Sequence, residues 1–353
     1  MEFSNIYSKI IYTPQWEQSL SDLISSYPKG KVFLATEENV DHLCLSNNDF
    51  FERNGIKKVV IPAGENHKKI SSVEKIWTFL SSGGADRKSL LINVGGGMLT
   101  DLGGFAASTF KRGIDFINVP TTLLSQVDAS VGGKTGINFN GLKNEIGVFK
   151  EPIAVVINTG FLKTLDRENF LSGFAEMIKH GLIHSTDHLN ELKAFNVKDI
   201  DYTKLSDAIQ HSVDIKSWFV AKDPTEKNIR KALNFGHTAG HAFESLAMEQ
   251  NRPILHGYAV AYGMITELLL SVQTCNFPLE DYKNLISWLT TLYGSFEITN
   301  TDFERIYELM THDKKNESGK INFTLLPRPG EIEINTHCSK ASVYEALHHF
   351  EKQ

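Results

Sequence analysis

Two histidines four residues apart, His237 and His241, are followed by a third, His256, in a short stretch before Gly257 that we expect to form a loop. On a helix, side chains at positions i and i+4 lie on one face. Neutral imidazoles and carboxylates are ligands of zinc and related divalent ions, and a catalytic site leaves one coordination position open. A chain with 13 histidines also produces this spacing by chance. The zinc-protease pattern HExxH is absent, because Thr238 follows His237.

A carboxylate that would complete a metal site lies in the segment GFAEMIKHG. On a helix, Glu176, Lys179 and His180 would share one face. One interpretation is a surface ion pair. The other is that Glu176, in an otherwise apolar helix start, is the third ligand beside His237 and His256.

Polar residues also precede His237 in the sequence. Four residues follow the spacing i, i+4, i+7 and i+11: Arg230, Asn234, His237 and His241. We therefore expect one helix from Arg230 to Met248 with a single polar stripe. Because such a stripe is too polar for a core, it predicts one wall of a site for an anionic, oxygen-rich ligand. Lys216 and Glu226 add charges to the same region.

A glycine-rich turn, GGGMLTDLGG, starts at Gly95 after the apolar run Leu90–Val94. Between a strand and a helix, such a turn lets backbone N–H groups approach a pyrophosphate. The pattern is not a regular GxGxxG, because Thr100 replaces the third glycine. Dinucleotide binding and a tight turn with close helix packing both remain open.

Two further loops, Pro62–Lys68 and Pro120–Thr122, also follow predicted strands. The carboxyl ends of parallel strands meet at one edge of the sheet, where ligands of α/β proteins bind. Each loop alone could be a plain connection. Together with the glycine turn, they favour a nucleotide crevice.

Several cations follow in the first half of the chain. Gly133-Lys134-Thr135 resembles the end of a P-loop, but Asp128 occupies the position of that motif's first glycine, so an NTPase is excluded. Lys134 is then a lysine on a flexible, glycine-flanked loop. With Lys143, Asn144 and the upstream segment 111–113, it predicts binding of a phosphate or carboxylate. The alternative is a set of solvated surface lysines.

These residues have to be positioned by two kinds of structure. Short apolar runs predict strands at 31–36, 58–61, 90–94, 116–119 and 154–157. Helical spacing predicts helices at 71–80, 171–184, 204–221, 230–248, 259–272 and 282–293, with one further strand at 321–326. Alternating strands and helices are typical of a parallel sheet. We expect an α/β fold with a Rossmann-like, mostly parallel N-terminal domain (1–160) and a mostly α-helical C-terminal domain (161–353).

Composition excludes other classes of protein. The chain has 353 residues, 41% hydrophobic residues and a net charge of −6, which argues against nucleic acid or anionic membrane as its partner. The apolar stretch 259–272 contains Glu267 and is too short to span a bilayer. Three distant cysteines and an N-terminus without a secretion signal predict a cytoplasmic protein.

Taken together, the motifs resemble those of the 3-dehydroquinate synthases, members of the sugar phosphate cyclases. The resemblance runs from about Val32 to Leu326, and its motifs are specific as a set. They are GGGMLTDLGGF, NVPTTLLSQVDASVGGKTGIN, LKNEIGVF, GFAEMIKHG, LNFGHTAGHAFE and ILHG. It implies catalysis by NAD and a divalent metal, Zn²⁺ or Co²⁺. The substrate would be 3-deoxy-D-arabino-heptulosonate 7-phosphate, a phosphorylated sugar acid, and the products 3-dehydroquinate and phosphate.

The resemblance also implies roles for individual residues. Metal ligands would be Glu176, His237 and His256. NAD would contact Glu37, Glu65, Lys68, Gly95, Gly96, Gly97, Asp101, Thr121, Thr122, Lys134, Lys143, Phe161 and Thr164. Catalytic residues would be Asp128, Lys134, Lys179, Glu226 and His241. Substrate would be bound by Arg112, Lys143, Asn144, Lys216, Arg230, Asn234 and Lys314, with Lys315 adjacent to the last. Glu37 replaces the family's usual aspartate, and Arg112 would reach across a homodimer into the neighbour's phosphate site.

Two other activities fit the same features. One is a related cyclase that uses sedoheptulose 7-phosphate, which has no carboxylate. The other is a metal-dependent polyol dehydrogenase with a similar layout. Lys216 and Arg230 could supply the charge that a buried carboxylate requires, and Asn234 could add a neutral donor. The resemblance also implies the carboxylated substrate, because cyclases of the other kind differ from dehydroquinate synthases at the positions of Lys216 and Asn234.

Overall fold

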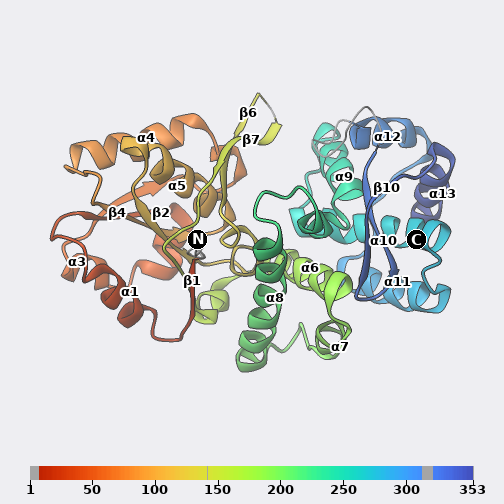
Figure 1. The fold of residues 1–353 in the computed structure, drawn as a ribbon, viewed down its shortest axis with the longest axis horizontal. Coiled ribbons are helices and arrows are strands. Elements are labelled where there is room, and N and C mark those ends of the chain that lie inside the picture. Colours follow the sequence, from red (N-terminus) through yellow and green to blue (C-terminus); the bar gives the residue numbers. More distant parts are fainter. Residues whose placement is uncertain (1–7, 141, 312–320, 353) are drawn as a thin grey trace, which may run out of the picture. The chain divides into compact units, whose positions relative to one another are not determined.

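The computed structural model describes residues 8–140, 142–311 and 321–352 (Figure 1). They form two compact units. The first contains the described residues up to Asp166 together with Asp201–Val213, and the second contains Arg167–Ile200 and the described residues from Asp214 onward. The expected α/β architecture, a parallel sheet followed by a mostly helical region, is confirmed.

A six-stranded parallel sheet forms the centre of the first unit. Its strand order is β1 (Lys9–Tyr12), β8 (Ala154–Ile157), β5 (Asp115–Pro120), β4 (Leu90–Gly95), β2 (Val32–Glu37) and β3 (Lys57–Ile61). All five predicted strands are confirmed. The unpredicted β1 is a four-residue edge strand, KIIY, without a fully buried side chain.

Helices cover both faces of this sheet. Leu91 packs on one face with α4 (Ile70–Ser82) and α5 (Gly97–Thr109). Its neighbour Ile92 packs on the other face with α1 (Trp16–Ile24) and the short α3 (Phe50–Arg53). Strands buried on both faces appear in sequence as continuous apolar runs, which explains why the central strands could be predicted.

The connections of the sheet create a binding position. After β2 the chain moves outward to β3, and it then returns to form β4 on the other side of β2. The carboxyl ends of β2 and β4 therefore flank the point where the strand order reverses. Ligands of open α/β sheets bind at this position.

A two-stranded antiparallel hairpin, β6 (Lys134–Phe139) and β7 (Leu142–Phe149), packs beside α5. The expectation of a flexible loop around Lys134 is wrong, because Lys134 is the first residue of β6. Phe139 pairs with Leu142 on either side of the Asn140–Gly141 dipeptide. Asn-Gly is a strong hairpin signal in a sequence.

The second unit is mainly helical. Its helices are α6 (Arg167–His184), α7 (Thr186–Ala194), α9 (His237–Glu249), α10 (His256–Cys275), α11 (Leu279–Tyr293), α12 (Phe303–Thr311) and α13 (Lys340–Glu351). Helix α8 (Tyr202–Lys222) begins in the first unit and ends in the second. The strand predicted at 321–326 is β9 (Phe323–Arg328), which pairs with β10 (Glu331–Thr336). Helix α10 packs against α6, α9, α11, α13 and β9. No helix among the described residues is long and apolar enough to cross a membrane.

Candidate active site

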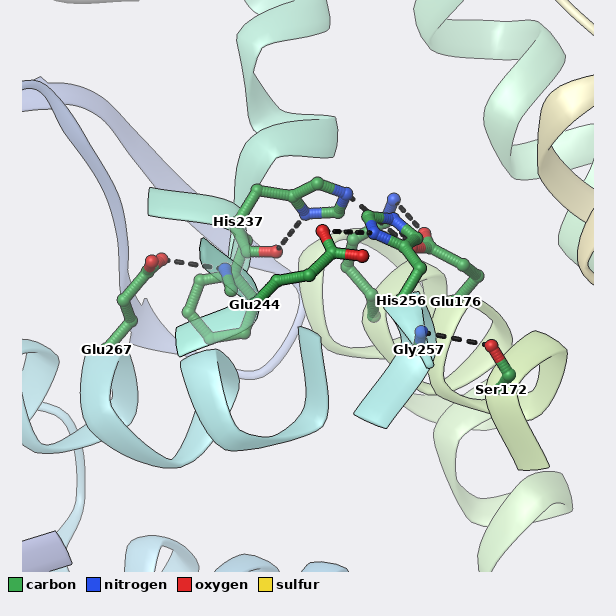
Figure 2. Close-up of polar contacts among 10 residues, drawn as sticks. Ser172, Glu176, His237, Glu244, His256, Gly257 and Glu267 are labelled. Carbon is green, nitrogen blue, oxygen red and sulfur yellow. Dashed lines mark hydrogen bonds and ion pairs between the residues drawn. The ribbon is translucent and has the colours of Figure 1, made fainter. Parts of the chain in front are cut away.

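Three predicted metal ligands meet in the second unit (Figure 2). Glu176 lies on α6, His237 is the first residue of α9 and His256 is the first residue of α10. The Nε2 atoms of His237 and His256 lie 3.5 and 3.6 Å from the same atom, Oε1 of Glu176. One ligand atom from each residue lies within 4.8 Å of the others. The structure therefore brings together a carboxylate and two imidazoles from three helices.

The opposite ring nitrogens point away from this centre. Nδ1 of His237 lies 3.1 Å from the carbonyl oxygen of Phe235. Nδ1 of His256 lies 3.6 Å from Oε2 of Glu244. Contacts of this kind fix the orientation of metal-binding histidines and leave Nε2 for the ion. Two imidazole nitrogens and one carboxylate oxygen with an open fourth position suit a catalytic Zn²⁺ or Co²⁺ ion.

Electrostatics favour positive charge at the same point. Burial by itself lowers the pKa of His256, but hydrogen bonding and attraction by Glu176 and Glu244 outweigh it and raise the pKa to about 10. The two carboxylates thus stabilise a cation between them. A divalent ion would supply such a charge in place of the ring proton.

Lys179 donates a hydrogen bond to Oε2 of Glu176 on the same helix. Both side chains and that of His180 are almost completely buried, so the interpretation as a surface ion pair is wrong. The predicted shared helical face is confirmed for α6. A buried lysine beside the carboxylate also limits the negative charge of the cluster.

The expected single helix from Arg230 to Met248 is wrong. The chain forms a 3₁₀ turn at Ile229–Asn234, and α9 starts only at His237. Between them, Gly236 has left-handed backbone geometry with φ 77°. A Cβ at this position would lie 2.6 Å from Cγ of Met264. Tertiary packing against α10 therefore breaks the helix, and the proposed stripe does not lie on one helix.

The predicted anion-binding residues of the 3₁₀ turn have local partners. Nη1 of Arg230 donates to the carbonyl oxygen of Pro224 at 2.7 Å, and Nδ2 of Asn234 donates to Oε1 of Glu226 at 2.9 Å. The unpredicted Asp223 organises this segment, because it accepts backbone hydrogen bonds that include one from Arg230. Burial tends to raise the pKa of Asp223, but these hydrogen bonds lower it overall.

Two further predicted residues belong to the second unit. The ring centre of His241 lies 5.4 Å from that of His237 and 5.9 Å from that of His256, so the three rings form one cluster. Lys216 is buried on α8.

The loop expected at 253–257 ends at Leu255, and His256 is the first residue of α10. The next residue, Gly257, donates its N–H to Oγ of Ser172 on α6 at 3.0 Å. A Cβ on Gly257 would lie 1.9 Å from the carbonyl oxygen of Ser172. Only glycine permits this approach of α10 to α6, which brings His256 to Glu176.

The predicted glycine turn lies at the reversal point of the sheet. Oε1 of Glu37, at the end of β2, accepts a hydrogen bond from the N–H of Gly96 at 2.7 Å. Burial raises the pKa of Glu37 although this hydrogen bond opposes the shift. Thr121 bonds through its N–H to the carbonyl oxygen of Gly95, and a Cβ on Gly96 would lie 3.2 Å from Cγ2 of Thr122. Gly97 is the first residue of α5.

A polar network extends from this turn to the hairpin. Nζ of the buried Lys68 lies 2.5 Å from both Oδ2 of Asp101 and Oδ1 of Asn144. Nδ2 of Asn138, on β6, donates to Oε1 of Glu65. Burial tends to lower the pKa of Lys68, but Asp101 and Glu65 raise it overall. Residues predicted to bind NAD thus contact a residue predicted to bind substrate.

The remaining predicted residues have separate positions. Phe161 and Thr164 line a cavity of about 230 Å³ together with Trp16 and Cys44. Lys143 lies on β7. Asp128 lies in a short helical turn, Ser125–Ala129, and its charge contributes to a raised pKa of Asp101, for which burial is the main cause. Lys314 and its neighbour Lys315 lie outside the described residues.

Arg112 lines a second cavity, of about 280 Å³, with Arg87, Lys150 and Phe149. The residues at 111 and 112 both have positive φ angles, 48° and 70°. Such geometry is uncommon outside glycine and is often found at functional positions.

Glu244 and Glu267 were not among the predicted site residues. Glu244 follows His237 by seven residues, so helical spacing places it on the face of the histidines. Glu267 interrupts the apolar stretch 259–272. A charged residue in such a helix is itself a signal, because charges are rarely buried without a partner.

Comparison with known proteins agrees with this arrangement. The sequence model of the 3-dehydroquinate synthase N-terminal domain matches residues 58–172, and that of the C-terminal domain matches residues 173–316. The 3-dehydroquinate synthase of Parabacteroides distasonis is 48% identical over 342 residues, 96% of either chain.

Solved structures share the fold. The 2-epi-5-epi-valiolone synthase of Streptomyces hygroscopicus, determined with NAD⁺ and Zn²⁺, superposes with a TM-score of 0.87 over 100% of this chain and 99% of its own, at 21% identity. A 2-deoxy-scyllo-inosose synthase, determined with carbaglucose-6-phosphate, NAD⁺ and Co²⁺, gives a TM-score of 0.83 over 97% and 96%, at 23% identity. On the domain matches and the close sequence relative, the chain belongs to the 3-dehydroquinate synthase family.

Proposed function

We propose that the chain converts 3-deoxy-D-arabino-heptulosonate 7-phosphate to 3-dehydroquinate and phosphate. The steps are an NAD-dependent oxidation, elimination of phosphate, reduction by the NADH just formed and an aldol cyclisation, so NAD is regenerated. Family membership over nearly the whole chain supports the reaction class. The observation that carries the proposal is the convergence of Glu176, His237 and His256.

In this proposal, Glu176, His237 and His256 hold Zn²⁺ or Co²⁺. When bound, such an ion supplies Lewis acidity to hydroxyl groups of the substrate. The structures of two cyclases of the same fold contain these ions. Lys179 holds the Glu176 carboxylate through a buried hydrogen bond, and His241 lies beside the ligand rings as a proton carrier.

The first domain, residues 1–160, binds NAD, which supplies the hydride acceptor. The cofactor would occupy the reversal point of the sheet, where Glu37 and the N–H groups after Gly95 meet. Glu37 accepts hydrogen bonds from the adenosine ribose in this arrangement. The other proposed contacts are Glu65, Lys68, Asp101, Thr121, Thr122, Lys134, Lys143, Phe161 and Thr164.

The second domain, residues 161–353, holds the metal and much of the substrate. Lys216 and Arg230, both buried, supply the charge that a buried substrate carboxylate requires, and Asn234 adds a neutral donor. The remaining proposed contacts are Arg112, Asp128, Lys134, Lys143, Asn144, Glu226 and Lys314.

We further propose that the chain forms a homodimer through the β6–β7 hairpin. Five large apolar side chains of this hairpin are exposed: Phe139, Leu142, Ile146, Val148 and Phe149. A cluster of exposed apolar side chains marks an interaction surface. The cavity of Arg112 is lined by two of these residues, which supports its proposed reach into the neighbouring subunit. The three cysteines are free thiols, which supports a cytoplasmic location.

Phosphate release from two sugars tests the activity. The purified protein is given the deoxyheptulosonate phosphate or sedoheptulose 7-phosphate, with Zn²⁺ and NAD far below the substrate concentration. We expect many turnovers of the first sugar per NAD, no growing NADH absorbance, and little release from the second. Equal turnover of sedoheptulose 7-phosphate would indicate the other cyclase, and one NADH per product would indicate a polyol dehydrogenase.

A further inference from the structure

Two buried carboxylates lie beside the metal ligands without belonging to the ligand set (Figure 2). Glu267, on α10, is 0% exposed, and Glu244, on α9, is 6% exposed. Burying a carboxylate is unfavourable unless hydrogen bonds or opposite charge compensate. Their contacts therefore show what each one stabilises.

Glu267 binds the start of the helix that carries His237. Its Oε2 atom accepts a hydrogen bond from the N–H of Gly236 at 2.7 Å, and its Oε1 atom accepts one from the N–H of Ala239 at 3.0 Å. The first N–H groups of a helix have no partner within the helix and are usually capped by the preceding side chain. Here that residue is Gly236, so Glu267 of the neighbouring helix acts as the cap.

Close packing of the two helices makes this contact possible. A Cβ on Gly263 would lie 1.9 Å from the carbonyl oxygen of Gly236, and one on Gly240 would lie 2.8 Å from that of Ala259. Gly263 and Glu267 are one turn apart on the same face of α10. The glycine brings the backbone of α9 against α10, and the carboxylate then fixes the first turn, where His237 is the first residue.

Glu244 acts on the other histidine. It lies on α9, and its Oε2 atom is 3.6 Å from Nδ1 of His256 on α10. The two carboxylates therefore act reciprocally. Glu267 of α10 fixes the helix of His237, and Glu244 of α9 orients the ring of His256.

We infer that Glu244 and Glu267 are positioning residues that hold the two histidine ligands in the geometry for metal binding. The inference rests on the metal site proposed above. Neither carboxylate belongs to the proposed ligand set. Because they set where the imidazoles lie, their loss weakens metal binding and distorts coordination while leaving the three ligands present.

The test is a Co²⁺ titration of the metal-free, full-length protein, followed by the visible absorption of bound Co²⁺. Glu267→Gln and Glu244→Gln keep side-chain volume and remove the charge. We expect the Kd for Co²⁺ to rise about 10- to 100-fold in each variant, the scale for groups that support metal ligands. The absorption bands should also shift. Leu347→Ala is the control, because it removes a buried side chain of α13 outside the cluster.

The thermal midpoint of every metal-free protein is measured first, and titrations are run well below it. A lower midpoint with unchanged Kd and spectrum in both glutamine variants would show a structural role only and overturn the inference. If Glu267→Gln does not fold, Glu244→Gln decides in the same way. Absence of Co²⁺ binding by the unaltered protein would instead overturn the proposed metal site and, with it, this inference.

Discussion

The two histidine ligands are held by different kinds of group. Nδ1 of His237 faces a backbone carbonyl oxygen, and Nδ1 of His256 faces the carboxylate of Glu244. A carboxylate partner makes an imidazole more basic and a better ligand than a carbonyl partner does. Glu244 beside His256 thus contributes more to the electrostatic attraction for a cation than the carbonyl group beside His237 does. The raised pKa of His256 agrees with this.

His256→Ala should remove stoichiometric metal and most activity, because a site with three protein ligands loses one of its donors. Elemental analysis of the purified variant measures the first effect, and phosphate release measures the second. His348→Ala, an exposed histidine of α13, is the control. Full metal content in the His256 variant would refute the proposed ligand set.

Individual site residues could be predicted from the sequence where the residue type itself restricts the possible chemistry. The spacing of His237 and His241 and the carboxylate in GFAEMIKHG led to residues that the structure brings together. Glu267 could not be assigned in the same way. Its partners are backbone N–H groups 28 and 31 residues away. A backbone N–H group does not depend on the residue type, so the sequence does not reveal this contact.

Among the elements, the central strands could be predicted because burial on both faces gives continuous apolar runs. The β6–β7 hairpin was missed because β7 is exposed along nearly its whole length and lacks the alternation of a half-buried strand. The break before α9 was missed for another reason. A glycine within a helical pattern is usually tolerated, and only contact with α10 places Gly236 in the left-handed region.

Gly236→Ala should lower the free energy of unfolding by about 2–5 kcal/mol. Left-handed geometry costs a residue with a Cβ about 1–2 kcal/mol, and the contact with Met264 adds about 1–3 kcal/mol of overpacking. Gly84→Ala is the control, since Gly84 has φ 81° and no atom within 4 Å of its Cβ position. The control variant should lose only the part of the unfolding free energy that comes from its positive-φ backbone geometry. Chemical denaturation measures both, and equal losses would show that the contact with α10 does not matter.

For the molecule as a whole, the proposed association explains why a chain with an ordinary apolar content has so uneven a surface. Five of its exposed large apolar side chains belong to one small hairpin. Two short strands form little core of their own. Packing a second copy against the hairpin would bury apolar side chains and stabilise the segment that carries Lys134, Lys143 and Asn144.

Phe149→Asp should therefore shift the protein from dimer to monomer, because a charge would replace an exposed apolar side chain of the proposed interface. Phe149 is 59% exposed in the single chain, so the substitution should have little effect on folding of the subunit. Leu279→Asp is the matched control, since Leu279 is 53% exposed at the start of α11 and lies outside the hairpin. Sedimentation velocity at micromolar concentration distinguishes the two states.

If Arg112 acts in the neighbouring subunit, activity should fall when the dimer dissociates. Adding an inactive His256→Ala protein with an intact hairpin should not restore the activity, because the Phe149→Asp protein cannot associate with it. A monomeric unaltered protein, or an equal loss of association in Leu279→Asp, would contradict the hairpin interface.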